Sequence, residues 1–227
     1  MRIGIYGGTF NPIHRGHLTA AAAAAKQLCL DKLLLVPDAI PPHKPLPAGS
    51  ADAADRLEMV QLCTGELPVP AEVTDLELRR QGASYSCDTL AALREQYPAD
   101  ELFFLMGSDM FLSFESWRRP EEICRLATLA VFSRRTADEA AAFARQKEKL
   151  EKAFSARVTV VMNPEVIEVS STQLREELAQ GRGRAYLTEP VYGYILRKGL
   201  YGTATDLKHL TPEELRPIAL SYLKPKR

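Results

Sequence analysis

The segment GGTFNPIHRGHL, residues 7–18, separates a short apolar run, Ile3–Tyr6, from an alanine-rich stretch. The apolar run predicts a buried strand, and the residues from about His17 to Cys29 predict a helix. Glycines at a strand-to-helix turn let the backbone bend sharply and come close to a ligand. The start of the helix offers free N–H groups and a positive dipole end, which suit phosphate. This segment therefore predicts a phosphate-binding turn that follows a buried strand.

Apolar runs and helical patterns alternate along most of the remaining chain. We expect further strands at Leu33–Val36, Val69–Leu78, Leu102–Met106, Leu129–Phe132 and Val158–Met162, and helices at Ala53–Thr64, Asp88–Tyr97, Ala137–Phe154, Ser171–Ala179 and Val191–Lys198. Short continuous apolar runs between helices are typical of a parallel sheet that is covered on both faces. The expected fold class is therefore α/β, with a doubly wound, mostly parallel sheet. Right-handed crossovers would then gather Gly7, Pro37, Gly107 and Ser133, which follow strand ends, on the rim where ligands bind.

Composition argues against several classes of protein. Lys plus Arg equals Asp plus Glu at 29 each, so no overall field favours nucleic acid or an anionic membrane. The alanine run is far shorter than the about 20 apolar residues that span a bilayer. The four cysteines form no CxxC pair, which argues against a zinc site or a disulfide framework. We expect a cytoplasmic protein that binds neither nucleic acid nor membrane and has no all-protein metal site, and we leave a homo-oligomer open.

His14 and His17 lie three residues apart at the predicted helix start, so both side chains could face the same phosphate. Nucleotidyl transfer depends mainly on positioning and on neutralising charge in the transferred group. A histidine can do this as a hydrogen-bond donor, without acting as a base. The alternative is that one histidine caps the helix and the other lies at the surface. Two histidines on a glycine turn after a buried strand favour the phosphate-binding interpretation.

A second polar segment, VSSTQLR at residues 169–175, predicts another phosphate-binding helix start. Ser170 or Ser171 is a good N-cap, and further hydroxyls follow in the first turn. Hydroxyls, amides and the guanidinium of Arg175 could converge on a triphosphate. By itself the same pattern also describes an ordinary capped helix.

Together the two segments resemble the signatures HxGH and ISSTxxR of the nucleotidyltransferase superfamily of small α/β adenylyl- and cytidylyltransferases. The longer string GGTFNPIHRGH is similar to the nicotinate mononucleotide adenylyltransferase branch, whose members usually carry Asp where this chain has Asn11. The resemblance implies that His14, His17 and Arg175 are catalytic and stabilise the transition state. For ATP binding it implies Gly7, Gly8, Thr9, Phe10, Gly107, Asp109, Ser170, Ser171 and Thr172. Asp109 belongs to a GxD segment that lines the adenosine site in that family.

Other segments of the resemblance concern the acceptor. A PPHK loop implies that Lys44 reaches the phosphate of the mononucleotide, and SYSCDTL at residues 84–90 implies that Tyr85 and Ser86 help to hold the nicotinate carboxylate. Trp117 matches a tryptophan that stacks on the pyridine ring, and Arg134 matches an arginine near the acceptor phosphate. Without the resemblance, the loop could be solvated, Asp88 could be a helix N-cap and Trp117 could pack in the core.

The resemblance implies transfer of AMP from ATP to nicotinic acid mononucleotide by direct in-line attack, with Mg²⁺ bound mainly through the ATP phosphates. The same chemistry on nicotinamide mononucleotide stays open. Phosphopantetheine or a phosphorylated alcohol is disfavoured by Trp117 and by residues 84–89. A nucleotide-binding regulatory module without chemistry is the alternative from another class. We expect residues 1–201 to form the nucleotidyltransferase domain, and residues 202–227, with a helix at Pro212–Leu223, to form an extension packed on it.

Overall fold

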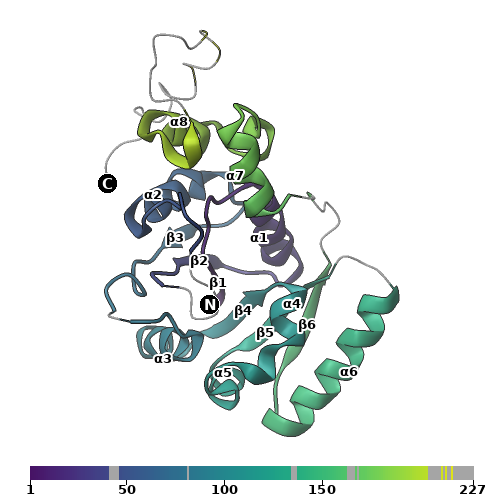
Figure 1. Ribbon diagram of the computed structural model, residues 1–227. Helices are drawn as coiled ribbons and strands as arrows, with labels where there is room; N and C mark the ends of the chain where they lie inside the picture. The colour runs from purple at the N-terminus through teal and green to yellow at the C-terminus, as the bar shows by residue number, and fades with distance from the viewer. Residues whose placement is uncertain are drawn as a thin grey trace.

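The computed structural model describes residues 1–40, 46–80, 82–133, 137–162, 167, 169–203, 211, 213 and 216. Its centre is a parallel sheet of six strands in the order β3-β2-β1-β4-β5-β6 (Figure 1). The strands are β1 (Arg2–Gly8), β2 (Lys32–Pro37), β3 (Ala71–Val73), β4 (Glu101–Met106), β5 (Thr128–Ser133) and β6 (Val158–Met162). The chain runs outward from β1 to β3 and then crosses back to β4, so the direction of strand order reverses between β1 and β4. This doubly wound arrangement confirms the predicted fold class.

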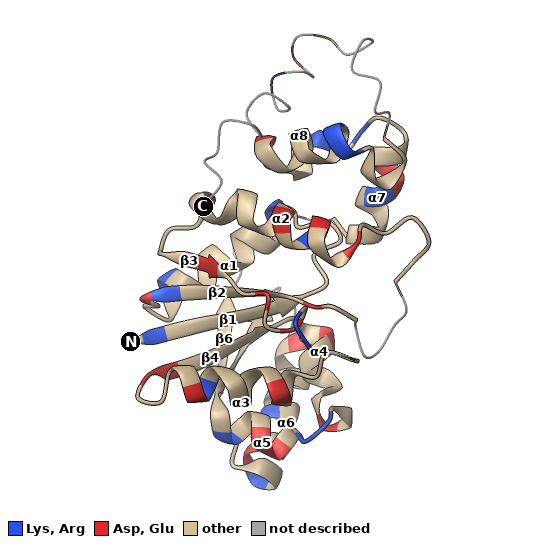
Figure 2. Ribbon diagram, turned by 90° about the vertical axis from the view of Figure 1, so that its left-hand side faces the viewer, with Lys and Arg blue, Asp and Glu red and all other residues tan. Residues whose placement is uncertain are grey.

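Helices cover both faces of the sheet (Figures 1 and 2). One face carries α1 (Arg15–Gln27), α2 (Ala53–Cys63), α7 (Ser171–Ala179) and α8 (Glu189–Lys198); the other carries α3 (Ser86–Gln96), α4 (Ser108–Leu112), α5 (Pro120–Leu126) and α6 (Ala137–Phe154). Successive strand residues point to opposite faces. In β2, therefore, Leu33 and Leu35 pack in the core on the α1 side, and Leu34 and Val36 pack in the core on the α3 side. Each such buried side chain stabilises the fold by about 1.5–3 kcal/mol.

Several element boundaries differ from the sequence predictions. The predicted strand Val69–Leu78 is wrong over most of its length, because only Ala71–Val73 pairs with β2. Beyond Thr74 the chain leaves the sheet edge and forms a turn, in which the Arg79 N–H donates to the Asp75 carbonyl at 3.0 Å. Sequence analysis did not predict α4 and α5, which are short. The predicted helix Pro212–Leu223 lies almost wholly outside the described residues.

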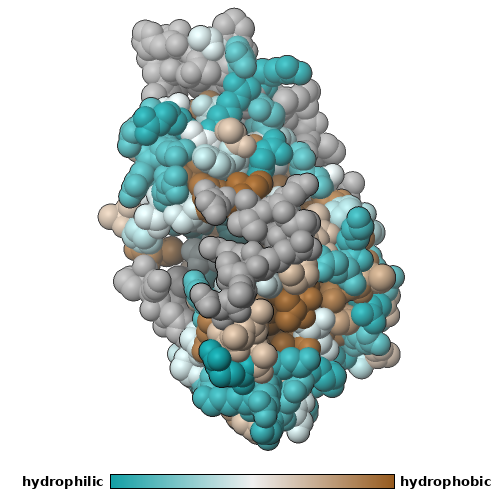
Figure 3. All heavy atoms as spheres, turned by 90° about the vertical axis from the view of Figure 1, so that its right-hand side faces the viewer, coloured by the Kyte–Doolittle hydropathy of each residue, from teal (hydrophilic) through white to brown (hydrophobic). Residues whose placement is uncertain are grey.

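The described surface is mixed in charge and hydropathy. Basic and acidic side chains are both distributed over the helices, with no large area of one sign in this view (Figure 2). Hydrophobic surface forms separate areas between hydrophilic side chains on the side that lies at the right of Figure 1 (Figure 3). In the described part of the chain, no helix combines the length and the apolar character that crossing a membrane requires.

Candidate functional site

A cavity of about 510 Å³ opens at the carboxyl edge of the sheet, over the point where the strand order reverses. This is the position at which open α/β sheets bind their ligands. Its lining includes Gly7, Gly8, Thr9, Asp38, Glu77, Tyr85, Ser86, Gly107, Trp117, Arg118, Ser171, Thr172 and Arg175. A smaller hollow shares Gly107 with this cavity, and its lining includes His14, Gly16, His17, Ser108 and Ser133. The cavity and the hollow thus adjoin each other at Gly107, and we treat the two together as the candidate site.

The two histidines stack on each other at the start of α1, with ring centroids 3.8 Å apart. His14 is the N-cap residue, and its backbone N–H donates to Nδ1 of His17 at 3.3 Å. Since Nδ1 of His17 accepts, the neutral ring carries its proton on Nε2, which is left as a donor. The Phe10 ring packs edge-on against His17 at 5.2 Å and supports it from the core. His14 therefore caps α1, as one of the two sequence interpretations proposed, and this position leaves its predicted role in phosphate binding open.

Burial keeps both imidazoles neutral. It lowers the pKa of His14 from 6.5 to about 4. Burial, and then the neighbouring His14, hold the pKa of His17 well below its ordinary value. Nδ1 of His14 is buried and, among the described residues, has no hydrogen-bond partner. The pair therefore offers polar groups to an incoming anion without carrying charge beforehand.

Gly16 allows this stacking. A Cβ atom at this position would lie 3.0 Å from Nδ1 and 3.1 Å from Cε1 of His14, and 3.5 Å from the Ile167 carbonyl oxygen. Contacts this short are tighter than ordinary packing, so a side chain here would displace the imidazole. The glycine between the two histidines is therefore needed for space.

The late segment meets the early one directly. Nη1 of Arg175 donates to the Asn11 carbonyl at 2.8 Å, across 164 residues of sequence, and Nη2 donates to the Thr172 hydroxyl at 3.2 Å. Ser170 is the N-cap of α7, as expected, and its hydroxyl accepts from the Gln173 N–H at 3.1 Å. The Asn11 side chain is buried and donates to the Ser50 hydroxyl at 2.7 Å, so it holds the loop before α2. The phosphate-binding elements predicted from the two segments thus lie at one site.

Three of the residues predicted to hold the acceptor, Trp117, Tyr85 and Ser86, also line the cavity. Trp117 follows the turn Phe114–Ser116, and its ring lies 6.1 Å from Phe104 and 5.5 Å from Phe114, so one edge is packed while the residue lines the cavity. Tyr85 is the N-cap of α3 and Ser86 is its first residue. The N-cap interpretation of Asp88 is wrong, because Asp88 lies inside the first turn and pairs with Arg119.

Not every predicted residue lines the cavity or the hollow. Phe10 is 2% exposed and packs beneath the site, and Asp109 is an exposed residue in the first turn of α4. Ser170 acts as a cap next to the lining residues. Lys44 and Arg134 lie outside the described residues. The structure places these five residues away from the cavity lining or does not describe them, and the roles of all the predicted site residues stay predictions.

Sequence reasoning missed three charged groups of the site. Asp38 accepts from the Thr9 hydroxyl at 2.7 Å and pairs with the buried Arg56. Glu77 accepts from the Thr89 hydroxyl at 2.6 Å, and burial raises the pKa of its carboxyl. Arg118 stacks over the Tyr85 ring at 4.6 Å. None of these residues belongs to a motif found in the sequence, although Arg118 directly follows Trp117.

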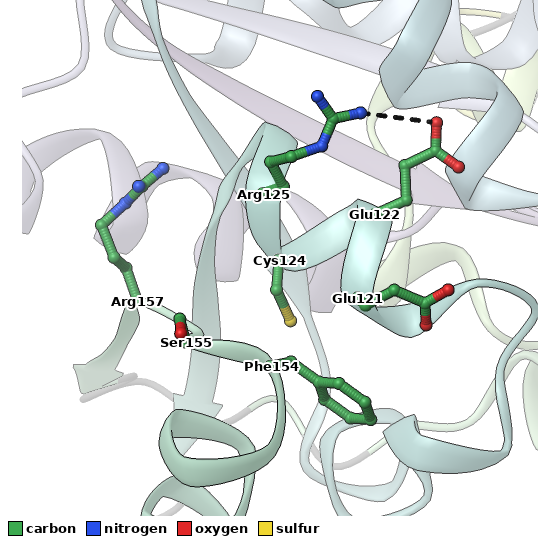
Figure 4. Close-up of a pocket in the computed structure, with 7 residues that line it drawn as sticks. All are labelled: Glu121, Glu122, Cys124, Arg125, Phe154, Ser155 and Arg157. Atoms are coloured by element: carbon green, nitrogen blue, oxygen red, sulfur yellow. Dashed lines mark ion pairs between the residues drawn. The ribbon is translucent and has the colours of Figure 1, made fainter.

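A second hollow, of about 540 Å³, lies at the opposite, amino-terminal edge of the sheet (Figure 4). Arg125 forms an ion pair with Glu122 there at 3.9 Å. Burial raises the pKa of the Cys124 thiol to about 11, so the thiol stays protonated at neutral pH. Glu121 and Glu122 occupy the first turn of α5, and their negative charges make that end of the helix unfavourable for a phosphate. This hollow lacks the features that suit a nucleotide.

The described residues contain no cluster of three or more His, Cys, Asp or Glu side chains that could hold a metal ion. Mg²⁺ commonly keeps several waters and binds through substrate phosphates with one or two carboxylates. The candidate site is therefore compatible with a Mg²⁺ ion that is bound to the phosphates of ATP and enters the cavity together with them.

Comparisons with known proteins agree with this geometry. The cytidylyltransferase-like family model matches residues 5–177 of the chain. Similar curated proteins from Gloeobacter violaceus and Thermus thermophilus are both 42% identical to it and both named probable nicotinate-nucleotide adenylyltransferase. The alignments cover 88% of this chain, with 96% of the first relative and 100% of the second. A solved structure of Plasmodium falciparum nicotinic acid mononucleotide adenylyltransferase with NaAD has a TM-score of 0.69 and 18% identity, and covers 88% of this chain and 97% of that chain. At this identity the likeness shows a shared fold.

Proposed function

Since the chain belongs to the nicotinate-nucleotide adenylyltransferase family, we propose that it transfers AMP from ATP to nicotinic acid mononucleotide and releases pyrophosphate. The observation that carries the proposal is the contact between Arg175 and the Asn11 carbonyl at 2.8 Å. This contact brings the guanidinium of the second motif to the turn that carries the two histidines. A cytoplasmic location, and residues 1–201 as the catalytic domain, are part of the same proposal.

The reaction is an in-line displacement at the α-phosphorus of ATP. A phosphate oxygen of the acceptor forms the new P–O bond, and the bond between the α-phosphorus and the bridging oxygen of pyrophosphate breaks. The acceptor phosphate is already ionised at neutral pH, so no protein nucleophile is required. The protein contributes positioning and charge stabilisation, which supply most of the catalysis in such transfers.

The chain's own groups have distinct tasks in this scheme. His14 and His17 are neutral before ATP binds, and the anionic phosphates raise their pKa values once it is bound. They then donate hydrogen bonds to the oxygens on which negative charge develops. Ser171 and Thr172 supply hydroxyls, and Arg175 supplies a permanent charge. Mg²⁺ on the ATP phosphates would neutralise part of their charge, held mainly by phosphate and water.

The acceptor would lie beside Trp117, Tyr85 and Ser86. A flat indole suits stacking on a pyridine ring. Arg118 lines the same part of the cavity, so an anionic group of the acceptor has a nearby cation. This favours an acceptor with a carboxylate, while the choice between nicotinate and nicotinamide mononucleotide is decided by measurement.

A pyrophosphate-release assay with ATP and a panel of acceptors tests the proposal. We expect the highest kcat/KM with nicotinic acid mononucleotide, a lower value with nicotinamide mononucleotide, and no release with phosphopantetheine. His14→Ala and His17→Ala should each lower kcat by about 10²–10³, with little change in nucleotide affinity. Binding of both nucleotides without pyrophosphate release would favour the regulatory module instead.

The matched control compares Arg175, in the middle of α7, with Arg182, which lies past the C-terminal end of that helix. Arg175→Ala should abolish most turnover. Arg182→Ala should not, because the Arg182 side chain is exposed and, among the described contacts, donates only to the Gln180 side chain at 2.6 Å. Equal turnover of the two variants would contradict the role given to Arg175.

A further inference from the structure

Arg56, in the first turn and a half of α2, is a fully buried charge next to the site, with 0% of its side chain exposed. A buried guanidinium costs several kcal/mol unless hydrogen bonds and an opposite charge compensate it. Arg56 donates to the Thr9 carbonyl at 2.7 Å, to Oδ1 of Asp38 at 3.1 Å and to the Ala39 carbonyl at 3.2 Å. All three partners belong to segments that follow strand ends at the cavity.

The first of these segments is the glycine turn. Arg56 binds its backbone at Thr9, and the Thr9 hydroxyl donates to Oδ2 of Asp38 at 2.7 Å. Both oxygens of the Asp38 carboxylate are therefore engaged, one by Arg56 and one by Thr9. Thr9 and Asp38 both line the cavity. The guanidinium fixes the ATP-side turn to the residues just after β2.

The second segment, residues 38–40, is hydrogen-bonded to Ser84, next to the residues proposed to hold the nucleotide that accepts AMP. The Ala39 N–H donates to the Ser84 hydroxyl at 3.1 Å, and the Ser84 N–H donates to the Ile40 carbonyl at 3.0 Å. Ser84 directly precedes Tyr85 and Ser86. A continuous set of hydrogen bonds therefore runs from Thr9, through Arg56 and residues 38–40, to the segment proposed to hold the acceptor.

We propose that Arg56 is a positioning residue that sets the spacing between the glycine turn and the acceptor segment. The inference rests on the proposed function, because the two segments must present two substrates to each other. In-line transfer is sensitive to this spacing, since a misplacement of about 1 Å can cost about 10² in rate. A purely structural arginine would affect the free energy of unfolding without this effect on the reaction.

Arg56→Lys tests the proposal, because lysine keeps the charge but cannot reach three acceptors in a fixed plane. Arg94→Lys is the matched control. Arg94 is a part-buried arginine at the opposite edge of the sheet, and it donates to the carbonyls of Tyr97, Asp100 and Leu126 at 3.1, 2.8 and 2.7 Å. Both variants should lower Tm. Only Arg56→Lys should also lower kcat, by about tenfold or more, while the Kd values of ATP and of the mononucleotide, each measured alone, change less than about threefold.

Asp38→Asn provides a second variant that keeps the size of the side chain, and it decides the question if Arg56→Lys does not fold. It should lower kcat in the same way, because the amide removes the negative charge opposite the buried guanidinium and has one accepting oxygen where the carboxylate has two. Equal kcat for the Arg56→Lys and Arg94→Lys proteins, or unchanged kcat in folded Asp38→Asn, would overturn the inference alone. Absence of pyrophosphate release by the unmodified protein would overturn the proposed function and this inference with it.

Discussion

Replacing Gly16 by Ala should impair the reaction without destabilising the fold. The added Cβ would lie 3.0 Å from Nδ1 and 3.1 Å from Cε1 of His14, whereas ordinary contacts are 3.4–4 Å, so the imidazole must move by about 0.5 Å. If about 1 Å of misplacement costs about 10² in rate, this shift costs about tenfold, or about 1.4 kcal/mol in the activation barrier. Alanine meanwhile favours the helix over glycine by up to about 1 kcal/mol.

Steady-state pyrophosphate release and thermal unfolding measure the two effects separately. We expect kcat of the Gly16→Ala protein to fall about tenfold while Tm stays within a few degrees of the unmodified protein. Ala22→Gly is the control, since it changes α1 by the same methyl group away from His14. It should lower Tm and leave kcat unchanged. Full activity in Gly16→Ala would refute the requirement for space beside His14.

Three further predictions concern charge and stacking. Burial lowers the pKa of His14 from 6.5 to about 4, so His14 takes up a proton at a higher pH in the unfolded state than in the folded state. The free energy of unfolding should therefore fall by at most about 3 kcal/mol as the pH drops from 6.5 to 4. Denaturant titrations of the His14→Gln protein should show a shallower fall, and a fall identical to that of the unmodified protein would contradict the burial argument. Arg118→Gln should raise KM for nicotinic acid mononucleotide about tenfold and leave KM for ATP unchanged. The control Arg125→Gln, in the hollow of Figure 4, should change neither KM. An equal rise of both KM values in the Arg118→Gln protein would exclude an acceptor-specific role for Arg118. The fluorescence of Trp117, the single tryptophan, should fall on titration with the mononucleotide, and an unchanged signal at saturation would place the pyridine ring elsewhere.

The fold was largely predictable because its strands are short continuous apolar runs. Leu102–Met106 is the clearest case, since a strand buried on both faces needs apolar side chains at every position. The same rule failed for β3. It is a short edge strand, and residues 69–78 look strand-like although most of them leave the sheet. Helices as short as α4 contain too few residues to show a helical period.

The site was predictable where local geometry imposes a motif. The glycine turn with its two histidines and the hydroxyl-rich start of α7 each lie within a segment of at most twelve residues, so a sequence pattern can reveal them. Arg56, Asp38 and Glu77 were not predictable in this way. Their partners lie on other elements, and an isolated Arg, Asp or Glu in a sequence is most often exposed. Only the tertiary contacts distinguish them.

A structure with a non-hydrolysable ATP analogue and nicotinic acid mononucleotide tests the central claim most directly. We expect its polyphosphate to contact both imidazoles near the N-terminus of α1, the first turn of α7 and the Arg175 guanidinium, with the mononucleotide beside Trp117. A polyphosphate bound away from both helix starts, or in the hollow at the amino-terminal edge of the sheet, would contradict the account.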